Sequence, residues 1–505
     1  MPRNYDYDII IIGSGLGGLV CGAILSMNGY KVCVYEKNRQ IGGCLQTYSR
    51  NKAILDTGVH YIGGLAEGQQ LHQIFKYLDI IDKLKLKRLD MDGFDHISFK
   101  DDNKTYKLAQ GYDNFIKQLL KDFPDEEAAL HNYCEKLKEV CNKFPLYNLR
   151  TGDYKEKEDV LDIGTYEYLQ SITENKKLQQ VLAGNNLLYA GEADKTPLYI
   201  HALITNSFIE SAWKCIDGGS QIAKQLGKCI TNHGGVIHRN TKVVAISAES
   251  GNAEHITLEN GEKVTAKYFI SNMHPAQTIE ITESSVFRAA YRNRMKKLDN
   301  SMGPFLLNIV LKKNTFPYLN YNFYYHETDN AWHGVDYSND NWPLTYALFV
   351  NASSECGEFA DSLTIMTYMR YEDVAKWEQT FNTDSHKDER GAEYQDFKNK
   401  KAAQLLDLVA KKFSALKDSI LSYYIATPLS YRDYQGTADG SMYGISKDYR
   451  STFKTFIAPR TKIPNLFLTG QNLNLHGILG VAISSLMTCS ELLDIEPLLE
   501  KIRNA

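Results

Sequence analysis

A glycine-rich turn near the start of the chain joins a short apolar segment to a longer segment with helical spacing. Residues 8–12 form a continuous apolar run, the pattern of a strand buried on both faces. The turn occupies residues 13–18, with the sequence GSGLGG, and apolar side chains then recur at helical spacing over 19–30. Residues 31–36 form a second apolar run. This order predicts a β-α-β unit and therefore a parallel sheet with helices packed on its faces.

The spacing of the glycines indicates what the turn binds. Gly13, Gly15 and Gly18 follow the pattern G-x-G-x-x-G. Between a strand and a helix, the first glycine permits a tight turn, the second lets the backbone approach a pyrophosphate, and the third lets helix and strand pack closely. Glu36 is the last residue of the second apolar run, at residues 31–36. A carboxylate at this position is placed to accept hydrogen bonds from the ribose of the dinucleotide. We therefore predict a dinucleotide site, and the glycine pair at 42–43 favours FAD over NAD because the chain continues along the cofactor.

The composition is that of a water-soluble globular protein. The chain has 505 residues, of which 43% are hydrophobic, and a net charge of −4, which excludes a globally basic nucleic-acid-binding protein. Its length predicts about two to four domains. Nine cysteines without a Cys-x-x-Cys pair favour a reducing, cytoplasmic compartment, and neither they nor the 13 histidines form a metal-type cluster. We expect no bound metal, no signal peptide and no membrane-spanning helix.

Segments along almost the whole chain resemble one superfamily of flavoproteins. After the GSGLGG turn, EKNRQIGGCLQTY begins at residue 36 and LDTGVHYIGG begins at residue 55. Later matching segments lie at 215–226, 241–246, 269–275, 427–429 and 465–486. Together they resemble the phytoene desaturase-like, FAD-dependent amine oxidase superfamily, and within it the retinol saturase and carotenoid isomerase branch. Many relatives have Arg directly after the glycine pair, whereas Cys44 fits the retinol saturase pattern better.

The resemblance implies an α/β fold with two functional parts. An FAD-binding, Rossmann-like domain of the GR2 type is expected to be discontinuous and to combine residues 1–70, 214–285 and 440–505. An α+β substrate domain is expected to combine a helical cap over 71–213 with a mixed or antiparallel sheet over 286–439.

The glycine motif and the resemblance together imply a set of FAD-binding residues. In the first part of the chain these are Gly13, Ser14, Gly15, Leu16, Gly17, Gly18, Glu36, Lys37, Gly42, Gly43, Cys44 and His60. Further along they are Val243, Val244, Asn272, Gly470, Gln471, Asn472, Gly480 and Val481. The strand at Val243 would offer its backbone to the adenine, and the helix near Gly480 would direct its positive N-terminus at the flavin. The family often has Asp where Asn472 stands; Asn still accepts a hydrogen bond there, without charge assistance.

Three side chains are candidates for catalysis. His60 and Tyr61 follow the second glycine pair and are expected to reach the face of the flavin ring, and His476 precedes the helix that faces the flavin. An acid such as His60 or Tyr61 would supply a proton to the substrate. The same two residues also fit polar core side chains that hold a loop by hydrogen bonds.

The resemblance, rather than the composition, implies the substrate class. It implies an apolar polyene or isoprenoid whose carbon–carbon double bond is saturated, desaturated or isomerised. Tyrosines cluster at 318–325 and 423–434, which suits the wall of a long apolar pocket but equally suits packing on a sheet. Two other functions stay open: a flavin amine oxidase, and a flavin-free lipid-binding chaperone on the same architecture.

Two connecting segments carry further expectations. Residues 187–213 have few charges near their end and fit either an internal lid or a lid that docks on a bilayer and gives peripheral membrane contact. Residues 146–164 are rich in Lys, Glu and Asp and are expected to form an exposed loop.

Overall fold

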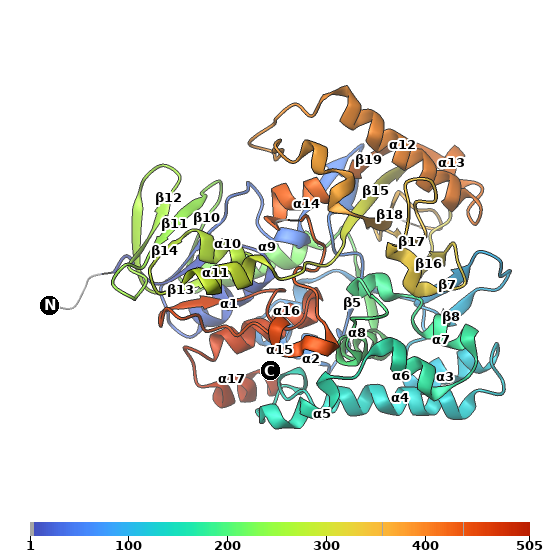
Figure 1. Cartoon of the computed structure of the whole chain (residues 1–505), viewed down its shortest axis with the longest axis horizontal. Helices are drawn as coiled ribbons and strands as arrows, with labels where there is room; N and C mark the ends of the chain where they lie inside the picture. The colour runs from blue at the N-terminus through green and yellow to red at the C-terminus, as the bar shows by residue number, and fades with distance from the viewer. Residues whose placement is uncertain (1–4, 356, 438) are drawn as a thin grey trace.

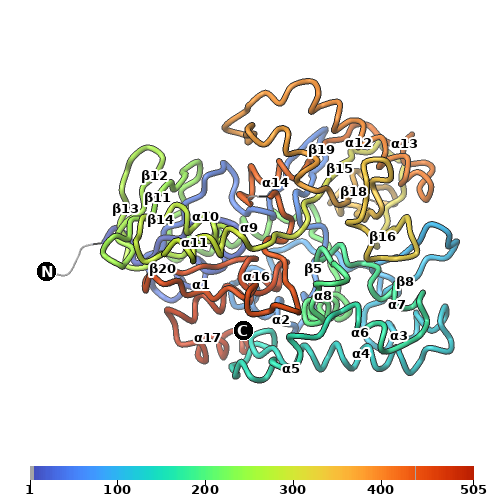
Figure 2. The backbone as a smooth tube through the Cα atoms, viewed as in Figure 1, coloured from blue at the N-terminus to red at the C-terminus, as the bar shows by residue number. Residues whose placement is uncertain are grey.

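Two large sheets lie at opposite ends of the molecule, with helices around and between them (Figure 1). The computed structural model describes residues 5–355, 357–437 and 439–505. The backbone trace shows the blue start and the red end of the chain side by side in the part that contains the first sheet (Figure 2).

The first sheet has eight strands in the order β10-β2-β1-β13-β12-β11-β14, with β20 also paired to β13. Its strands are β1 (Tyr7–Ile12), β2 (Val32–Tyr35), β10 (Val236–His238), β11 (Val243–Ser247), β12 (His255–Leu258), β13 (Lys263–Ser271), β14 (Thr282–Glu283) and β20 (Leu466–Leu468). Strands β2, β1, β13 and β20 run parallel to one another. Because parallel strands bring their carboxyl ends to one edge, the segments that follow these four strands meet there.

Helices from distant parts of the sequence cover this sheet. They are α1 (Leu16–Met27), α9 (Ser220–Asn232) and α16 (Gly477–Cys489). The Ser485 hydroxyl of α16 donates to the carbonyl of Gly17 in α1 at 3.3 Å, and Cys21 Sγ lies 3.4 Å from Thr469 Oγ1. The predicted Rossmann-like, discontinuous arrangement of the first and last segments is therefore confirmed.

The second sheet has seven strands in the order β19-β15-β18-β17-β16-β7-β8. They are β7 (Asp95–Phe99), β8 (Tyr106–Leu108), β15 (Gly303–Leu311), β16 (Asn322–His326), β17 (Thr345–Val350), β18 (Ser362–Met369) and β19 (Ile420–Ala426). All neighbours are antiparallel except β16 and β7, which are parallel. Strands β7 and β8 come from the segment expected to be a helical cap and complete this sheet.

The remaining elements connect and cover the two sheets. The small strands are β3 (Thr47–Arg50), β4 (Ala53–Asp56), β5 (Ile62–Gly63), β6 (Leu86–Arg88) and β9 (Ala212–Cys215). The other helices are α2 (Gln70–Tyr77), α3 (Tyr112–Leu120), α4 (Glu127–Asn142), α5 (Glu158–Leu161), α6 (Thr165–Ile172), α7 (Lys176–Leu182), α8 (Leu198–Glu210), α10 (Pro275–Glu280), α11 (Ala289–Lys296), α12 (Gly391–Ala410), α13 (Leu416–Ser419), α14 (Pro428–Gln435), α15 (Thr452–Thr455) and α17 (Ile495–Arg503).

The structure favours one of the two alternatives for residues 187–213 and corrects the expectation for residues 146–164. Every residue of α8 from Leu198 to Ile209 is buried, so this helix fits the internal alternative rather than the one that docks on a bilayer. The segment 146–164 is not one exposed loop: it forms short helical turns that bury Tyr147, Leu149 and Val160. Its charged residues point outward from an apolar inner side, which the composition alone does not show.

Candidate active site

A cleft lies at the edge where the parallel strands of the first sheet end. It has a volume of about 150 Å³ and is lined by the turns at 15–17, 42–45 and 470–472 together with the start of α16. Helices α1 and α16 both begin at this cleft, with Gly15 and His476 at their N-caps. Neither first turn contains an acidic residue, and no side chain of the described residues caps either helix. Two uncapped helix N-termini therefore direct free N–H groups and positive dipole ends at the same cleft.

Small residues keep this cleft open. A Cβ atom built on Gly17 would lie 2.5 Å from Asn272 Oδ1 and 2.8 Å from the Cα of Gly470. A Cβ atom built on Gly15 would lie 2.6 Å from Asn272 Nδ2. The Asn272 amide thus lies among three glycines at the end of β13, where it is placed to contact a bound phosphate.

Glu36 organises the glycine turn from the end of β2. Its carboxylate accepts hydrogen bonds from the backbone N–H of Ser14 at 3.0 Å, from the Ser14 hydroxyl at 2.6 Å and from the N–H of Asn38 at 2.8 Å. A carboxylate has about four acceptor positions, so a ribose hydroxyl still finds one. Lys37 turns away and donates to the carbonyl of Asp433 at 2.9 Å, so it ties β2 to α14.

A second cavity, here called the inner chamber, opens from the cleft. It has a volume of about 120 Å³ and shares Gly58, Val59, Tyr431, Met442, Tyr443, Gly477 and Ile478 with the cleft. Its other walls are mostly apolar, with Phe208 and Phe349 among them. No Asp, Glu, Lys or Arg is found among the described residues that line it. Water and charged groups are therefore disfavoured in this space.

His60 lies flat in the wall of the inner chamber. Its ring stacks on Phe349 with centroids 4.5 Å apart, and neither ring nitrogen has a hydrogen-bond partner among the described residues. Burial, helped by the nearby Lys214 ammonium, lowers the pKa of His60 to about 3. The imidazole is therefore uncharged at neutral pH.

Tyr61 belongs to a buried chain of hydrogen bonds. Its hydroxyl lies 2.9 Å from Asp95 Oδ2 and 2.7 Å from the hydroxyl of Tyr324. The Asp95 carboxylate also accepts from Asn185 at 3.0 Å and from Asn322 at 2.9 Å. Burial has the largest effect on the pKa of Asp95 and raises it to about 6. The hydrogen bonds favour the ionised form and lower the pKa, but by less. A carboxyl group that titrates near neutrality thus lies one hydroxyl away from the inner chamber.

His476 has a fixed role at the start of α16. Its Nε2 lies 3.0 Å from the carbonyl of Leu188 and therefore carries the hydrogen, and its ring stacks on Tyr443 at 4.3 Å. Burial lowers its pKa to about 4. The ring lines the inner chamber, but its one N–H is already committed to the protein.

Comparison with known proteins agrees with this geometry. The model of the family described as flavin containing amine oxidoreductase matches residues 16–300, more than half of the chain. The chain belongs to this family. It is 26% identical over 531 residues to human all-trans-retinol 13,14-reductase, covering 96% of this chain and 85% of that protein. It is 23% identical over 511 residues to the chloroplastic prolycopene isomerase of Daucus carota, covering 96% and 80%.

Solved structures show the same fold. An oxidoreductase from Methanosarcina mazei superposes with a TM-score of 0.62 at 15% identity, covering 95% of this chain and 99% of that one. As a flavin containing amine oxidoreductase, the chain is a flavin-dependent enzyme with FAD as its cofactor. The cleft fits this group, because the α1 N-terminus and the glycines suit its pyrophosphate, and the α16 N-terminus suits the electron-rich end of the flavin.

The structure brings most of the predicted cofactor residues to one place. Those that line the cleft are Gly15, Leu16, Gly17, Gly42, Gly43, Cys44, Asn272, Gly470, Gln471, Asn472 and Val481. Four predicted residues do not line the cleft, namely Gly13, Ser14, Gly18 and Glu36, although Ser14 and Glu36 are hydrogen-bonded to each other within the glycine turn. His60 and Gly480 line the inner chamber instead. Val243 and Val244 lie on β11 outside the cleft lining, with Val244 exposed, so their contact with adenine stays a prediction.

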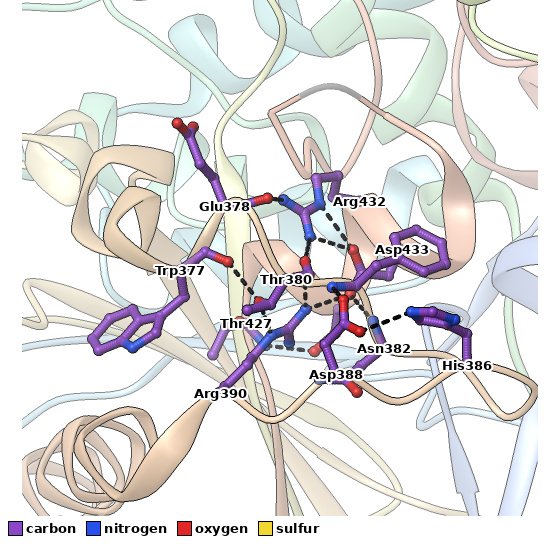
Figure 3. Close-up of polar contacts among 12 residues, drawn as sticks. Trp377, Glu378, Thr380, Asn382, His386, Asp388, Arg390, Thr427, Arg432 and Asp433 are labelled. Carbon is purple, nitrogen blue, oxygen red and sulfur yellow. Dashed lines mark hydrogen bonds and ion pairs between the residues drawn. The ribbon is translucent and has the colours of Figure 1, made fainter.

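Helix α14 is held against the cleft by a buried ion cluster (Figure 3). The fully buried Asp433 pairs with Arg390 at 2.5 Å and with Arg432 at 2.7 Å, and accepts from the N–H of Asn382 at 2.8 Å. The cluster fixes Tyr431, which lines both cavities. Sequence reasoning missed both Asp433 and Asp95, because their partners lie on other elements and no spacing pattern marks them.

Proposed function

We propose that this FAD-dependent oxidoreductase acts on a carbon–carbon double bond of an apolar polyene or isoprenoid. The observation that carries this proposal is the uncharged, aromatic inner chamber that opens directly from the cofactor cleft. Similarity to an all-trans-retinol 13,14-reductase and to a prolycopene isomerase supports the same substrate class. Reduction of the double bond and its isomerisation both fit this chamber.

The chain's own residues prepare the substrate for the cofactor. Bound FAD supplies the chemistry of hydride or electron exchange. The walls of the inner chamber exclude water and orient the polyene, and the rings of Phe349 and Phe208 provide flat apolar contacts. The N-terminus of α16 stabilises negative charge at the flavin end of the cleft.

For reduction, Tyr61 is the better proton donor of the two sequence candidates. The uncharged His60 holds no acidic proton at neutral pH because its pKa is lowered to about 3. The Tyr61 side chain lines the inner chamber, and its hydroxyl holds a proton and is hydrogen-bonded to Asp95, which can replace that proton. His60 then serves as a flat wall group that orients the polyene through its stack on Phe349.

A sequence of measurements on the purified protein tests this function. A yellow preparation with bound FAD is expected first, and a colourless one would favour the lipid-binding chaperone. The protein is then reduced with dithionite without oxygen and incubated with all-trans-retinol or a cis-carotenoid. We expect a product heavier by two hydrogen atoms for reduction, or of equal mass for isomerisation, by liquid chromatography and mass spectrometry. Bleaching of the oxidised flavin by benzylamine, with both polyenes unchanged, would instead indicate an amine oxidase.

We also propose a peripheral membrane contact at a site other than α8. In the described part of the chain, no helix combines the length and the apolar character needed to cross a bilayer. Phe453 on α15 is 73% exposed, and its ring lies 6.2 Å from that of Tyr154. This exposed aromatic side chain suits insertion into the surface of a bilayer from which an apolar substrate is taken.

A further inference from the structure

A short turn between α7 and α8, here called the chamber turn (residues 184–188), forms part of the wall of the inner chamber. Leu188 lines the chamber and is partly exposed, whereas all the other residues from 181 to 191 are buried. The second half of the turn lies in a 3-10 helix over Asn186–Tyr189. One side chain of this segment therefore meets whatever enters the inner chamber, while the rest of the segment is packed inside the protein.

Five consecutive residues of the chamber turn are hydrogen-bonded to five different partners. The carbonyl of Gly184 lies 2.8 Å from His326 Nε2, Asn185 donates to Asp95 at 3.0 Å, Asn186 donates to the carbonyl of Ala331 at 3.0 Å, the carbonyl of Leu187 accepts from the Tyr443 hydroxyl at 2.9 Å, and the carbonyl of Leu188 lies 3.0 Å from His476 Nε2. Tyr443 and His476 also line the inner chamber. The turn thus connects the chamber wall to the buried carboxyl that serves Tyr61.

Asn185 binds the same oxygen of Asp95 as Tyr61 does. Its Nδ2 lies 3.0 Å from Asp95 Oδ2, and the Tyr61 hydroxyl lies 2.9 Å from that oxygen, whereas Asn322 Nδ2 reaches Oδ1 at 2.9 Å. In the described part of the chain the Asn185 side chain makes no other hydrogen bond, since its Oδ1 has no partner. A proton that passes from Asp95 to Tyr61 has to lie on Oδ2, and an N–H directed at this oxygen favours the ionised carboxylate. Asn185 therefore opposes protonation where Tyr61 needs it.

The chamber turn belongs to a part of the wall that can give way. Ala190, two residues after Leu188, has the left-handed conformation, with φ 48° and ψ 54°, which side chains such as alanine rarely adopt. The inner chamber has a volume of about 120 Å³, whereas ligand pockets are typically about 300–1,000 Å³. A ligand that fills the chamber has to move part of its wall, and a shift of Leu188 releases the strain at Ala190.

We infer that Asn185 is a positioning residue that couples ligand binding in the inner chamber to protonation of Asp95. A ligand that presses on Leu188 displaces the chamber turn and withdraws Asn185 from Oδ2. The carboxyl then takes a proton from solvent and holds it on the oxygen that faces Tyr61. This inference rests on the proposed function and adds a control of its proton supply, because the acid is protonated when a substrate is present.

The other titratable groups near Asp95 do not depend on the chamber turn. Tyr61, Tyr324 and Lys214 interact with this carboxyl. The Lys214 ammonium donates to the carbonyl of Val350 on β17 at 2.8 Å. Burial lowers the pKa of Lys214 to about 7, so it titrates close to Asp95 and has to be distinguished from it by a variant.

Proton uptake on ligand binding tests this coupling in the oxidised, FAD-loaded protein, without turnover. All-trans-retinol is titrated by calorimetry at about pH 6.5 in two buffers with different heats of ionisation, and the difference gives the number of protons taken up per ligand. Loss of one hydrogen bond to a carboxylate should move the half-protonation of Asp95 from about pH 6 upward by about one pH unit. The wild-type protein should therefore take up about half a proton.

Variants identify the group that takes up the proton. Asn185→Leu lacks the hydrogen bond with and without ligand, so it should bind retinol with little proton uptake. Asn186→Leu is the matched control, because this neighbouring amide donates to the carbonyl of Ala331 and not to Asp95, and its uptake should equal that of the wild type. Asp95→Asn should take up no proton, which excludes Lys214 as the group that responds. FAD content and thermal unfolding show that each variant is folded.

The pH dependence of turnover gives a second test that needs only the wild-type protein. A decline near pH 6 belongs to the ligand-free protein and therefore to kcat/KM, whereas kcat reports the ligand complex. The decline in kcat should lie about one pH unit higher than the decline in kcat/KM. In Asn185→Leu both declines should occur at the higher pH.

The outcomes distinguish this inference from the proposed function. Retinol binding without proton uptake by the wild type, equal uptake by the wild type and Asn185→Leu, or uptake that persists in Asp95→Asn would overturn the coupling and leave the polyene function standing. Declines of kcat and kcat/KM at the same pH in the wild type would do the same. Failure of both all-trans-retinol and a cis-carotenoid to bind would overturn the proposed function as well.

Discussion

The protonation state of Asp95 decides which way the hydroxyl of Tyr61 points. When Asp95 is ionised, Tyr61 donates its only hydrogen to the carboxylate, and Tyr324 donates to Tyr61. When Asp95 is protonated, it donates to Tyr61 instead, and the hydrogen of Tyr61 is free to point into the inner chamber. Since burial raises the pKa of Asp95 to about 6, this reversal takes place just below neutral pH. Tyr324 and the buried Lys214 are the other titratable groups that interact with this carboxyl.

Replacing Asp95 with Asn should remove the proton supply and keep the cofactor. We expect turnover of the Asp95→Asn variant to fall on the order of a hundredfold, a typical loss for a proton-transfer group, with unchanged FAD content. The wild-type rate of reduction should decline as pH rises through about 6, because the protonated carboxyl is lost there, and the variant should lack this decline. Stopped-flow reoxidation of the reduced flavin between pH 5 and 8 measures both effects.

A matched variant separates this effect from general damage to the second sheet. Tyr346→Phe removes a fully buried hydroxyl that has no partner among the described residues, on strand β17, which is two strands away from β7 in the same sheet, and should leave the rate and its pH profile unchanged. If Asp95→Asn and Tyr346→Phe behave alike, Asp95 is not the proton source. Asp95 could not be found from the sequence, because its partners Tyr61 and Asn322 lie far away along the chain, and the pairing of β7 with β16 that places it beside Asn322 leaves no local pattern.

Helix N-termini, rather than individual side chains, make the cofactor cleft. Gly17→Ala should therefore abolish FAD binding, since its Cβ would lie 2.5 Å from Asn272 Oδ1 and 2.9 Å from the N of Gly470. Gly22→Ala in the same helix is the control: the three atoms nearest to its Cβ all belong to flexible side chains, Ile230 Cδ1 at 2.9 Å and Ile11 Cδ1 and Ile230 Cγ1 at 3.4 Å. FAD titration of the two purified variants should show loss for the first and near-wild-type affinity for the second. Equal losses would contradict the assignment of the cleft.

Buried charges decide the stability of the element that carries Tyr431. Asp433→Asn should destabilise the protein by about 3 kcal/mol, because it leaves Arg390 buried with no anion to pair with. Arg460→Gln breaks the pair with Glu491, in which the Arg460 side chain is 72% exposed, and should cost less than about 1 kcal/mol. Urea unfolding midpoints compare the two. A smaller loss for Asp433→Asn than for Arg460→Gln would show that the cluster in Figure 3 does not hold α14.

Elements with strong local patterns were predictable from the sequence, and those defined by long-range pairing were not. The apolar run of β1, the glycine turn and the final helix α16 carry the predicted fold, and all three lie where expected. Strands β7 and β8 are only five and three residues long and flanked by charged turns, so their place in the second sheet depends on pairing with β16. Likewise, residues 146–164 show charges in the sequence but bury the side chains of Tyr147, Leu149 and Val160.

At the scale of the whole molecule, the exposed α15 lies beside an apolar cavity of about 350 Å³ lined by residues 144–161, α8 and α16, and we expect an apolar substrate to enter on this side from a lipid phase. Thr452 and Phe456, which lie on either side of Phe453 in the sequence, both line this cavity. Phe453 is 73% exposed, and inserting such a side chain into a bilayer contributes about 1.5–3 kcal/mol. Phe453 therefore marks the face expected to approach the membrane.

Phe453→Ser should reduce binding to neutral phosphatidylcholine vesicles by roughly tenfold or more, measured as the fraction of protein that floats with the vesicles in a density gradient. Leu421→Ser provides the control: Leu421 is 56% exposed on β19 in the second sheet, away from α15, and its loss should not change flotation. Salt should have little effect, because the contact is apolar rather than electrostatic. Equal flotation of both variants and the wild type would place the membrane contact elsewhere on the protein.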